Sequence, residues 1–209
     1  MGRTAGDSPV VINGWTIYAH PLFLDQLEAL LVEVEALRAK DLQGYVSKNA
    51  SKRLAAIARL MLQDIPQDPS RKEYQQGSTL GAAHRHWRRA KFFQQYRLFF
   101  RFHTRSRLLV LGWVNDTDTK RAYGSKTDAY RVFQSMLASG PPPDNGEELL
   151  QYATQAAEAC GNSAIVCLER MRKRTGSGRQ VPAGIGPVAA SHRKRGSAHF
   201  QAGDRPGGP

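Results

Sequence analysis

The residues with the strongest chemical potential lie in one basic segment, from His84 to Arg131. This segment contains twelve basic and three acidic residues, with aromatic residues interleaved throughout. A guanidinium group can donate paired hydrogen bonds to phosphate oxygens, and an aromatic ring can stack on a nucleic-acid base. The composition therefore predicts a surface that binds a polyanion.

Residues 96–103 alternate in the manner of a β-strand. One set of alternate positions is apolar, and the other, from Arg97 to His103, is mainly cationic. We expect the apolar set to pack into the core and the cationic set to face solvent. The outer face would then present guanidinium groups to phosphates and a ring to a base. The side chains expected to bind RNA are His84, His86, Arg88, Arg89, Lys91, Phe99 and Arg101.

The same segment has a candidate for proton transfer. Cleavage of RNA by its own 2′-hydroxyl requires a proton acceptor, a proton donor for the 5′-oxygen, and positive charge at the phosphate. Arginine supplies charge but does not titrate near neutral pH. Tyr123 lies among Lys120, Arg121 and Lys126, and neighbouring cations favour a phenolate. Tyr123 is thus a candidate acid or base, with an aromatic residue at the edge of an element as the alternative.

No metal or cofactor site is expected. His84 and His86 are two residues apart and would form a proton-transfer or metal-binding pair if they shared a strand face, but no third ligand is near them in sequence. Asp116 and Asp118 lie in a short Asn-Asp-Thr-Asp segment that is typical of a turn. The chain has no glycine-rich phosphate loop. These features favour a metal-independent mechanism.

Periodicity predicts the elements that carry these residues. A strand is expected at residues 15–19, amphipathic helices from Leu22 and over 49–65, and strands at about 84–92, 95–104 and 107–115. A further helix is expected from Ala129 to Gly140, with Ser125 and Asp128 as an approximate capping box. The order β-α-α-β-β-β-α predicts an α+β fold, with an antiparallel sheet packed against two N-terminal helices and one C-terminal helix.

The charge distribution separates a folded domain from a tail. The net charge of +12 is concentrated in the basic segment and in residues 155–209, which have nine basic and three acidic residues. We expect a domain over residues 12–150, and a Gly-, Pro- and Arg-rich tail over 151–209 that contains at most a short helix and is otherwise disordered. With no membrane span or signal peptide apparent, the expected location is the cytoplasm.

Four segments resemble the YhaV toxins, a branch of the RelE/ParE superfamily. They are Trp-Thr-Ile-Tyr-Ala-His-Pro at 15–21, His-Arg-His-Trp-Arg-Arg-Ala-Lys-Phe at 84–92, Tyr-Arg-Leu-Phe-Phe-Arg-Phe at 96–102, and Val-Asn-Asp-Thr-Asp-Thr-Lys-Arg-Ala-Tyr-Gly at 114–124. The resemblance covers roughly residues 12–150. It implies a compact RelE-like toxin that cleaves RNA, in many relatives translated mRNA on the ribosome, and that is silenced by a PrlF-like antitoxin.

The resemblance also implies roles for individual residues. The arginine of the family's Tyr-Arg strand motif falls on Arg97, and the tyrosine after the last strand falls on Tyr123. RelE relatives often have an arginine where this chain has Asp116-Thr117-Asp118, so Lys120 or Arg121 must supply that charge. Two alternatives stay open: a non-catalytic protein that binds RNA or the ribosome, and a ParE-like inhibitor of DNA gyrase.

Overall fold

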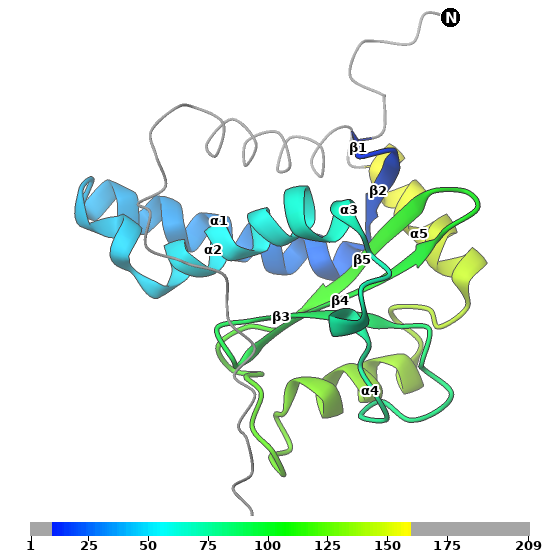
Figure 1. Cartoon of the computed structure of the whole chain (residues 1–209). Helices are drawn as coiled ribbons and strands as arrows, with labels where there is room; N and C mark the ends of the chain where they lie inside the picture. Colours follow the sequence, from blue (N-terminus) through cyan, green and yellow to red (C-terminus); the bar gives the residue numbers. More distant parts are fainter. Residues whose placement is uncertain (1–9, 160–209) are drawn as a thin grey trace, which may run out of the picture. The chain divides into compact units, whose positions relative to one another are not determined.

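The computed structural model describes residues 10–159, which form a five-stranded sheet with helices on both faces (Figure 1). The strands lie in the order β1-β2-β5-β4-β3. Their bounds are β1 Val10–Ile12, β2 Trp15–Ala19, β3 Arg88–Phe92, β4 Tyr96–His103 and β5 Leu108–Val114. The expected α+β class is confirmed.

The pairing of β3, β4 and β5 is antiparallel, as the short polar connections between them predict. β5 lies at the centre of the sheet and also pairs with β2, in parallel. The parallel pair is possible because the chain between β2 and β5 is long enough to cross over the sheet. The third strand begins at Arg88, later than the expected residue 84, and residues 84–87 form a turn.

The sequence interpretation missed β1, because it placed the first strand at residues 15–19. β1 pairs with β2 as an antiparallel hairpin, with Ile12 opposite Trp15. The two turn residues, Asn13 and Gly14, have φ values of 50° and 76°. Asn-Gly is the preferred dipeptide for such a turn, because both residues tolerate a positive φ. The dipeptide was therefore the available signal for this strand.

The first face of the sheet is covered by the N-terminal helices. These are α1 Pro21–Lys40, the short helix η1 Gly44–Ser47, α2 Asn49–Arg59, a π-helical turn η2 Leu60–Asp64, α3 Ile65–Gln67 and the short helix η3 Lys72–Tyr74. Apolar residues of α1 and α2, including Leu27 and Ile57, pack against Leu98 and Phe100 of β4. Both amphipathic helices expected from the apolar spacing are present, and in Figure 1 they lie above the β3–β5 strands.

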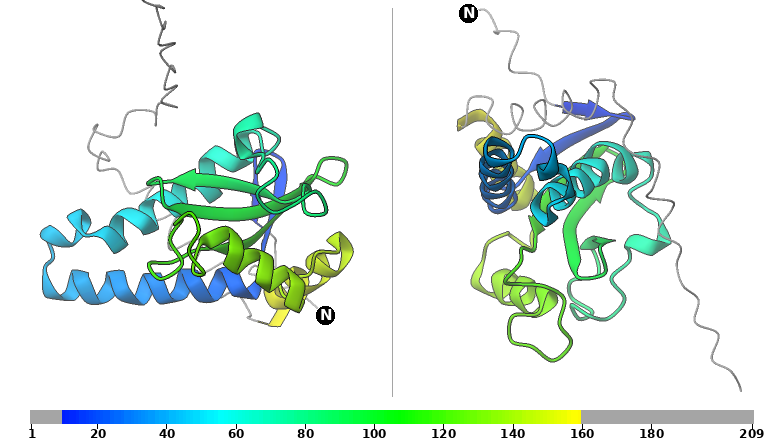
Figure 2. Two further views of the ribbon diagram at one scale, coloured as in Figure 1. Left: turned by 90° about the horizontal axis from the view of Figure 1, so that it is seen from below. Right: turned by 90° about the vertical axis from the view of Figure 1, so that its left-hand side faces the viewer.

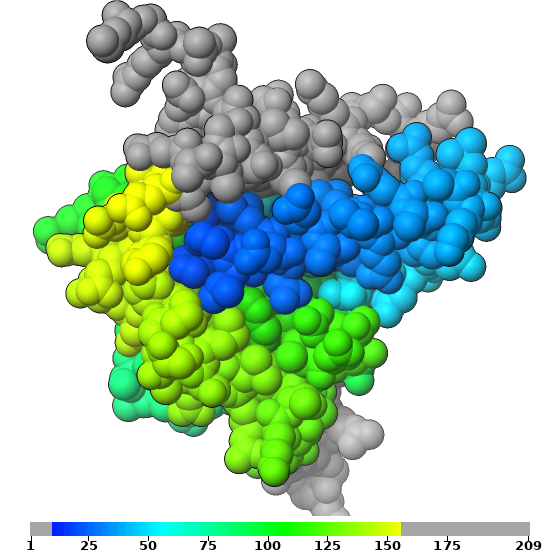
Figure 3. Space-filling view, turned by 180° about the vertical axis from the view of Figure 1, so that it is seen from behind, coloured from blue at the N-terminus to red at the C-terminus, as the bar shows by residue number. Residues whose placement is uncertain are grey.

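The opposite face is covered by α4 Ala129–Ser139 and α5 Gly146–Ala159. Phe133 of α4 and Leu149 of α5 share a second apolar cluster with Phe99 and Trp113 of the sheet. In Figure 2, α4 and the α1–α2 pair lie on different sides of the strands. Seen from behind, α1 (blue) runs beside the segment that leads into α5 (yellow) (Figure 3).

This second layer corrects the predicted exposure of β4. Phe99 is 0% exposed and stacks on Phe133, with 4.1 Å between their ring centroids, so the expectation that it offers a ring to an RNA base is wrong. Arg97 is also buried. Alternation identified the residues that share a face, but it did not show that the apolar stripe of α4 packs on that face and buries it.

The C-terminal helix crosses the expected domain boundary. α5 continues past residue 150, and its residue Ala153 is fully buried in the second apolar cluster. The expected tail otherwise lies outside the described residues. No helix within residues 10–159 is long and apolar enough to cross a membrane.

Candidate active site

Four cationic side chains gather where β3, β4 and the loop after β5 meet the start of α4. Lys91 of β3 pairs directly with Arg97 of β4, and Arg89 lies two residues before Lys91 on the same strand face. Arg121 reaches the same place from the loop. We call Arg89, Lys91, Arg97 and Arg121 the cationic cluster.

Tyr130 of α4 lies at the centre of the cationic cluster. The Nε of Arg89 donates a hydrogen bond of 2.7 Å to the Tyr130 hydroxyl. The Cζ atoms of Arg97 and Arg121 lie 5.9 Å and 5.1 Å from the centroid of the Tyr130 ring. Sequence reasoning did not select Tyr130.

The cations of the cluster repel one another, and this affects the pKa of its one lysine, Lys91. Burial lowers the pKa of Lys91, and the charges of Arg89, Arg97 and Arg121 lower it further. Within residues 10–159, Asp128 is the one carboxylate that forms an ion pair with a member of the cluster, Arg121. An anion placed here would relieve the repulsion among the cations, as a phosphate group does in many binding sites.

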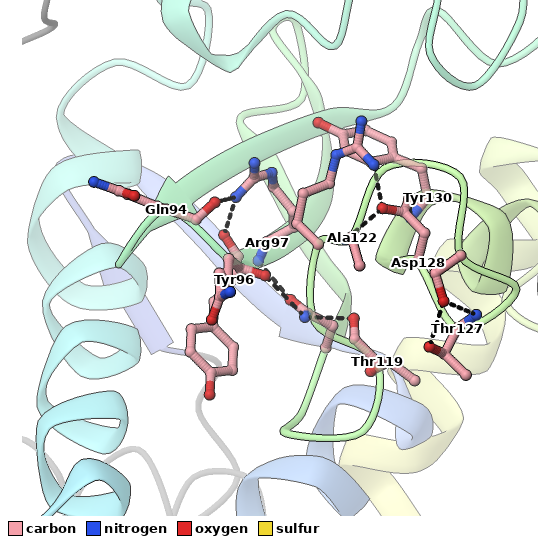
Figure 4. A network of polar contacts seen from close by, with 12 residues as sticks. Gln94, Tyr96, Arg97, Thr119, Ala122, Thr127, Asp128 and Tyr130 are labelled. Atoms are coloured by element: carbon pink, nitrogen blue, oxygen red, sulfur yellow. Dashed lines mark hydrogen bonds and ion pairs between the residues drawn. The ribbon is translucent and has the colours of Figure 1, made fainter.

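Arg97 is 6% exposed and is held by its own strand end. Its Nη1 donates hydrogen bonds of 2.7 Å to the carbonyl oxygens of Gln94 and Tyr96 (Figure 4). Its Nε has no hydrogen-bond partner among the described residues. Burial lowers the pKa of Arg97, while the Tyr130 phenol acts to raise it. The expected solvent-facing guanidinium is thus replaced by one that is buried beside Tyr130.

The loop after β5 is tied to the turn between β3 and β4. Asn115 is fully buried; its Oδ1 accepts a hydrogen bond from the Arg97 backbone nitrogen at 2.5 Å, and its Nδ2 donates to the carbonyl of Thr119 at 2.7 Å. The backbone nitrogen of Arg121 donates to the carbonyl of Gln95 at 2.8 Å. These bonds place Arg121 against the cluster.

The Asp116 and Asp118 segment forms the turn that its sequence predicts. The Oδ1 of Asp116 accepts hydrogen bonds from the backbone nitrogens of Asp118 and Thr119, both at 3.0 Å. It also accepts one from the Thr119 hydroxyl at 2.7 Å. Burial acts to raise the pKa of Asp116, but these hydrogen bonds outweigh it and the net shift is downward.

Asp128 connects this loop to α4, and sequence reasoning underestimated it. It is 2% exposed, and its Oδ1 accepts a hydrogen bond of 3.0 Å from the Tyr130 backbone nitrogen, which makes it the N-cap of α4. Its Oδ2 accepts from Arg121 and from the Ala122 backbone nitrogen (Figure 4). The expected capping box was therefore wrong: the cap is Asp128, and the Ser125 hydroxyl contacts Thr127 instead.

Tyr123 follows directly after the segment that Asp128 holds. It is 95% exposed, and the Cζ of Arg121 lies 5.5 Å from its ring centroid. A bound substrate could therefore reach its hydroxyl group. Lys120 is half-buried in the same loop. The structure thus places Arg121 beside both Tyr123 and Tyr130, and Arg97 beside Tyr130.

The other expected RNA-binding side chains do not form one continuous face. The Cζ of Arg88 lies 5.7 Å from the ring of Phe102, while the neighbouring Arg89 turns to Tyr130 on the other side of the sheet. The Nη1 of Arg101 donates to the backbone carbonyl of Asp144 at 2.5 Å, and burial lowers the pKa of Arg101. Arg88 and Arg101 are therefore separate from the cationic cluster.

His84 and His86 meet a third polar residue that the sequence did not indicate. The Nδ1 of His84 lies 3.2 Å from Oδ2 of Asp144, and the Nε2 of His86 lies 2.6 Å from its Oδ1. The Trp87 indole nitrogen also donates to Asp144 Oδ1, at 2.8 Å. Burial acts to raise the pKa of Asp144, but hydrogen bonds from His86 and Trp87, together with the contact with His84, give a net lowering.

Comparison with known families covers nearly the whole described region. Residues 17–154 match the model of the YhaV toxin family, described as toxins with endonuclease activity of toxin-antitoxin systems. The chain belongs to the YhaV toxin family. The YhaV match includes part of β2, all of β3, β4, β5 and α4, and most of α5, so it contains the whole cationic cluster.

Individual YhaV proteins are similar over almost their full length. Toxin YhaV of Escherichia coli O6:H1 (strain CFT073) is 44% identical over 152 residues, which cover 72% of this chain and 99% of the relative. Ribonuclease toxin YhaV of Escherichia coli K12 is 43% identical over 145 residues, or 68% of this chain and 94% of the relative. No solved structure matches the chain.

Proposed function

We propose that this YhaV-family toxin cleaves RNA by attack of the substrate's own 2′-hydroxyl, without a catalytic metal. The observation that carries this proposal is the cationic cluster, in which three arginines contact one phenol. Within residues 10–159, only one carboxylate forms an ion pair with a member of this cluster, Arg121. Such a site suits the extra negative charge that develops on a phosphate during cleavage. The name of the K12 relative, a ribonuclease toxin, supports RNA as the substrate.

The arginines hold the scissile phosphate in this mechanism. Arg97 and Arg121 stabilise the developing charge, and Lys120, close to Arg121 in the loop, adds positive charge at the edge of the site. None of the arginines transfers a proton near neutral pH. The proton transfers therefore belong to other groups.

Lys91 and Tyr123 can carry these transfers. The lowered pKa of Lys91 increases the fraction of its neutral amine, so we propose that Lys91 accepts the proton of the 2′-hydroxyl. The exposed hydroxyl of Tyr123 then donates a proton to the leaving 5′-oxygen. The bond from phosphorus to the 5′-oxygen breaks as the bond to the 2′-oxygen forms, which leaves a cyclic phosphate on one product.

The substrate and partner follow from the same site. We propose translated mRNA as the target, engaged with the ribosome, with Arg88, Arg101 and the two histidines outside the cluster as further contacts to the RNA backbone. The family description implies an antitoxin. We propose a PrlF-like antitoxin that covers the cationic cluster, so that complex formation weakens as salt concentration rises.

The decisive experiment uses purified toxin and two versions of one cleavable RNA. An RNA with a single 2′-deoxy nucleotide at the cleavage site should remain intact, because it lacks the nucleophile, while cleavage of the unmodified RNA should persist in EDTA. Lys91→Met should reduce cleavage by about a hundredfold or more through loss of the base. Lys52→Met, which removes an exposed lysine on α2, is the matched control.

Four results would contradict the mechanism. Cleavage of the 2′-deoxy substrate would exclude attack by the 2′-hydroxyl, and loss of activity in EDTA would require a metal. RNA binding with no cleavage under any condition would favour the non-catalytic alternative. Inhibition of DNA gyrase by the same preparation would favour the ParE-like alternative.

A further inference from the structure

His84, His86 and Asp144 form a compact group of metal-ligand atoms outside the cationic cluster. The three donor atoms all lie within 4.8 Å of one another. Their residues come from the turn before β3 and from the segment before α5, which lie far apart in sequence. The group lies near Arg88, at the other end of the β3–β4 pair from Lys91 and Arg97. It is therefore a second polar site, separate from the proposed catalytic one.

The spacing of these atoms is close to that of a tetrahedral metal site. A zinc ion bound to nitrogen at about 2.0–2.1 Å places neighbouring donor atoms about 3.3 Å apart. The contact between His84 Nδ1 and Asp144 Oδ2 already has this length, at 3.2 Å. The contact between His86 Nε2 and Asp144 Oδ1, at 2.6 Å, needs to widen by about 0.7 Å. A small side-chain rotation is sufficient for this.

The Nδ1 atom of His84 is the metal-ligand atom whose hydrogen-bonding capacity the fold does not satisfy. The Nδ1 of His84 is buried, and its 3.2 Å contact with Asp144 Oδ2 is not directed well enough to form a hydrogen bond within the described residues. Buried polar atoms are costly when they have no partner. A metal ion on this nitrogen would satisfy it. The side chains of His86 and Asp144 are about one-third exposed, so an ion can enter from solvent.

The surrounding residues hold the donors in place. The Nε2 of Gln76 donates to the carbonyl of His84 at 2.9 Å, which fixes the turn that carries both histidines. The indole nitrogen of Trp87 donates to the Asp144 carboxylate, and Arg101 donates to the Asp144 backbone carbonyl. Hydrogen bonds of this kind orient the ligands of metal sites.

We propose that His84, His86 and Asp144 bind one divalent transition-metal ion of the zinc type. Two imidazole nitrogens and the Asp144 carboxylate suit zinc and its neighbours, whereas Mg²⁺ prefers oxygen ligands alone. Water fills the remaining coordination position. The ion links the turn before β3 to the segment before α5, and it takes no part in the proposed cleavage step.

The test follows zinc binding by the full chain, without RNA, so it is independent of the ribonuclease proposal. After treatment with a chelator, the protein is titrated with Zn²⁺ while the ring signals of the individual histidines are observed by NMR. Signals of His84 and His86 should shift together and saturate near one equivalent. The melting temperature should rise, because the ion binds only the folded state. Excess Mg²⁺ should reproduce neither effect.

Variants separate this site from other zinc ligands in the chain. The double variant His84→Ala/His86→Ala should lose this binding step, with affinity reduced by more than about 100-fold, since loss of supporting hydrogen bonds alone costs 10-fold to 100-fold. His103→Ala removes an exposed histidine on β4 and should behave as wild type.

Two results would overturn the site. One is an absence of zinc-dependent shifts at His84 and His86 in the wild-type protein. That titration decides the question even if the double variant fails to fold. The other is equal zinc affinity in wild type and double variant, which would place binding elsewhere and leave the three side chains as a hydrogen-bonded clamp.

Discussion

Two tyrosines at the cationic cluster have opposite environments. Tyr130 is buried and accepts a hydrogen bond from Arg89, whereas Tyr123 is almost fully exposed beside Arg121. A buried phenol that is already bonded serves best to position arginines. An exposed phenol is free to meet a substrate. The proposed division of roles between the two tyrosines therefore follows from their burial.

Tyr123→Phe tests this division at the level of one oxygen atom. The change should reduce RNA cleavage by roughly a hundredfold while RNA affinity stays nearly constant, because only the proton donor is lost. Stability should not change, since the side chain is exposed. Tyr152→Phe removes the hydroxyl of another exposed tyrosine and is the control. If Phe were tolerated and Ala harmful, the ring would act by stacking and the catalytic assignment would be wrong.

At the scale of elements, α1 begins with a buried histidine. The Nδ1 of His20 accepts a hydrogen bond of 3.2 Å from the Leu22 backbone nitrogen, so it must be unprotonated to cap the helix. Burial lowers the pKa of His20 from 6.5 to about 4, although Asp25 acts to raise it. The start of α1 therefore depends on a neutral imidazole.

This cap should make the free energy of unfolding sensitive to mild acid. Between the folded-state pKa of about 4 and the ordinary 6.5, the unfolded chain binds a proton that the folded chain does not. Stability is then fully present above that range and decreases as pH falls through it. Urea unfolding across this range measures the effect. His20→Asn, which can cap without titrating, should show a smaller decrease, and an unchanged pH dependence would contradict the assignment.

The β4–β5 pair contains a bulge at which a glycine is required by packing. Phe99 pairs with Trp113, but the next residue, Phe100, pairs with Leu111, so Gly112 is the extra residue. A Cβ atom on Gly112 would lie 2.6 Å and 2.8 Å from two ring atoms of Trp87. Trp87 is fully buried and donates to Asp144. The absence of a side chain at Gly112 thus leaves room for the indole ring against the sheet.

Gly112→Ala should destabilise the protein by about 1–3 kcal/mol, because the added methyl group overpacks the site. Equilibrium urea unfolding measures this change. In the double variant Gly112→Ala/Trp87→Phe, the smaller ring should relieve part of the clash, so the two changes should not be additive. Strict additivity would mean that the clash with Trp87 is not the cause.

At the scale of the whole molecule, the folded region extends further along the chain than composition indicates. α5 buries Ala153, and matched residues of the CFT073 relative cover 99% of that protein but only 72% of this chain. A chain that ends at Ala159 should therefore unfold cooperatively, with a melting temperature close to that of the full chain. A broad transition or a large decrease in melting temperature would contradict this.

The same truncation should change RNA binding. Residues 160–209 contain nine basic and two acidic residues, and basic residues that contact phosphates release counterions. The truncated chain should bind RNA more weakly and with a smaller dependence on salt concentration, while it retains cleavage. An unchanged salt dependence would show that this segment does not contact RNA.

The sequence by itself determined which segments form elements and which chemistry they carry. Period-2 and period-3.6 patterns located β2, β4, β5, the N-terminal helices and α4, because these patterns follow from local backbone geometry. Charge counts located the basic segment, and four short motifs indicated the family, which the comparisons confirmed. The same reasoning proposed Arg97, Arg121 and Tyr123 as site residues, and their roles stay a prediction.

Only the tertiary structure decided what covers each face and which distant residues meet. Alternation along β4 groups Arg97 with Phe99, but the packing of α4 determines that this face is buried. Likewise Tyr130 joins the arginines, and Asp144 joins His84, across many residues of sequence. Local patterns report the period of one segment, whereas these contacts depend on how separate segments pack to bury apolar surface.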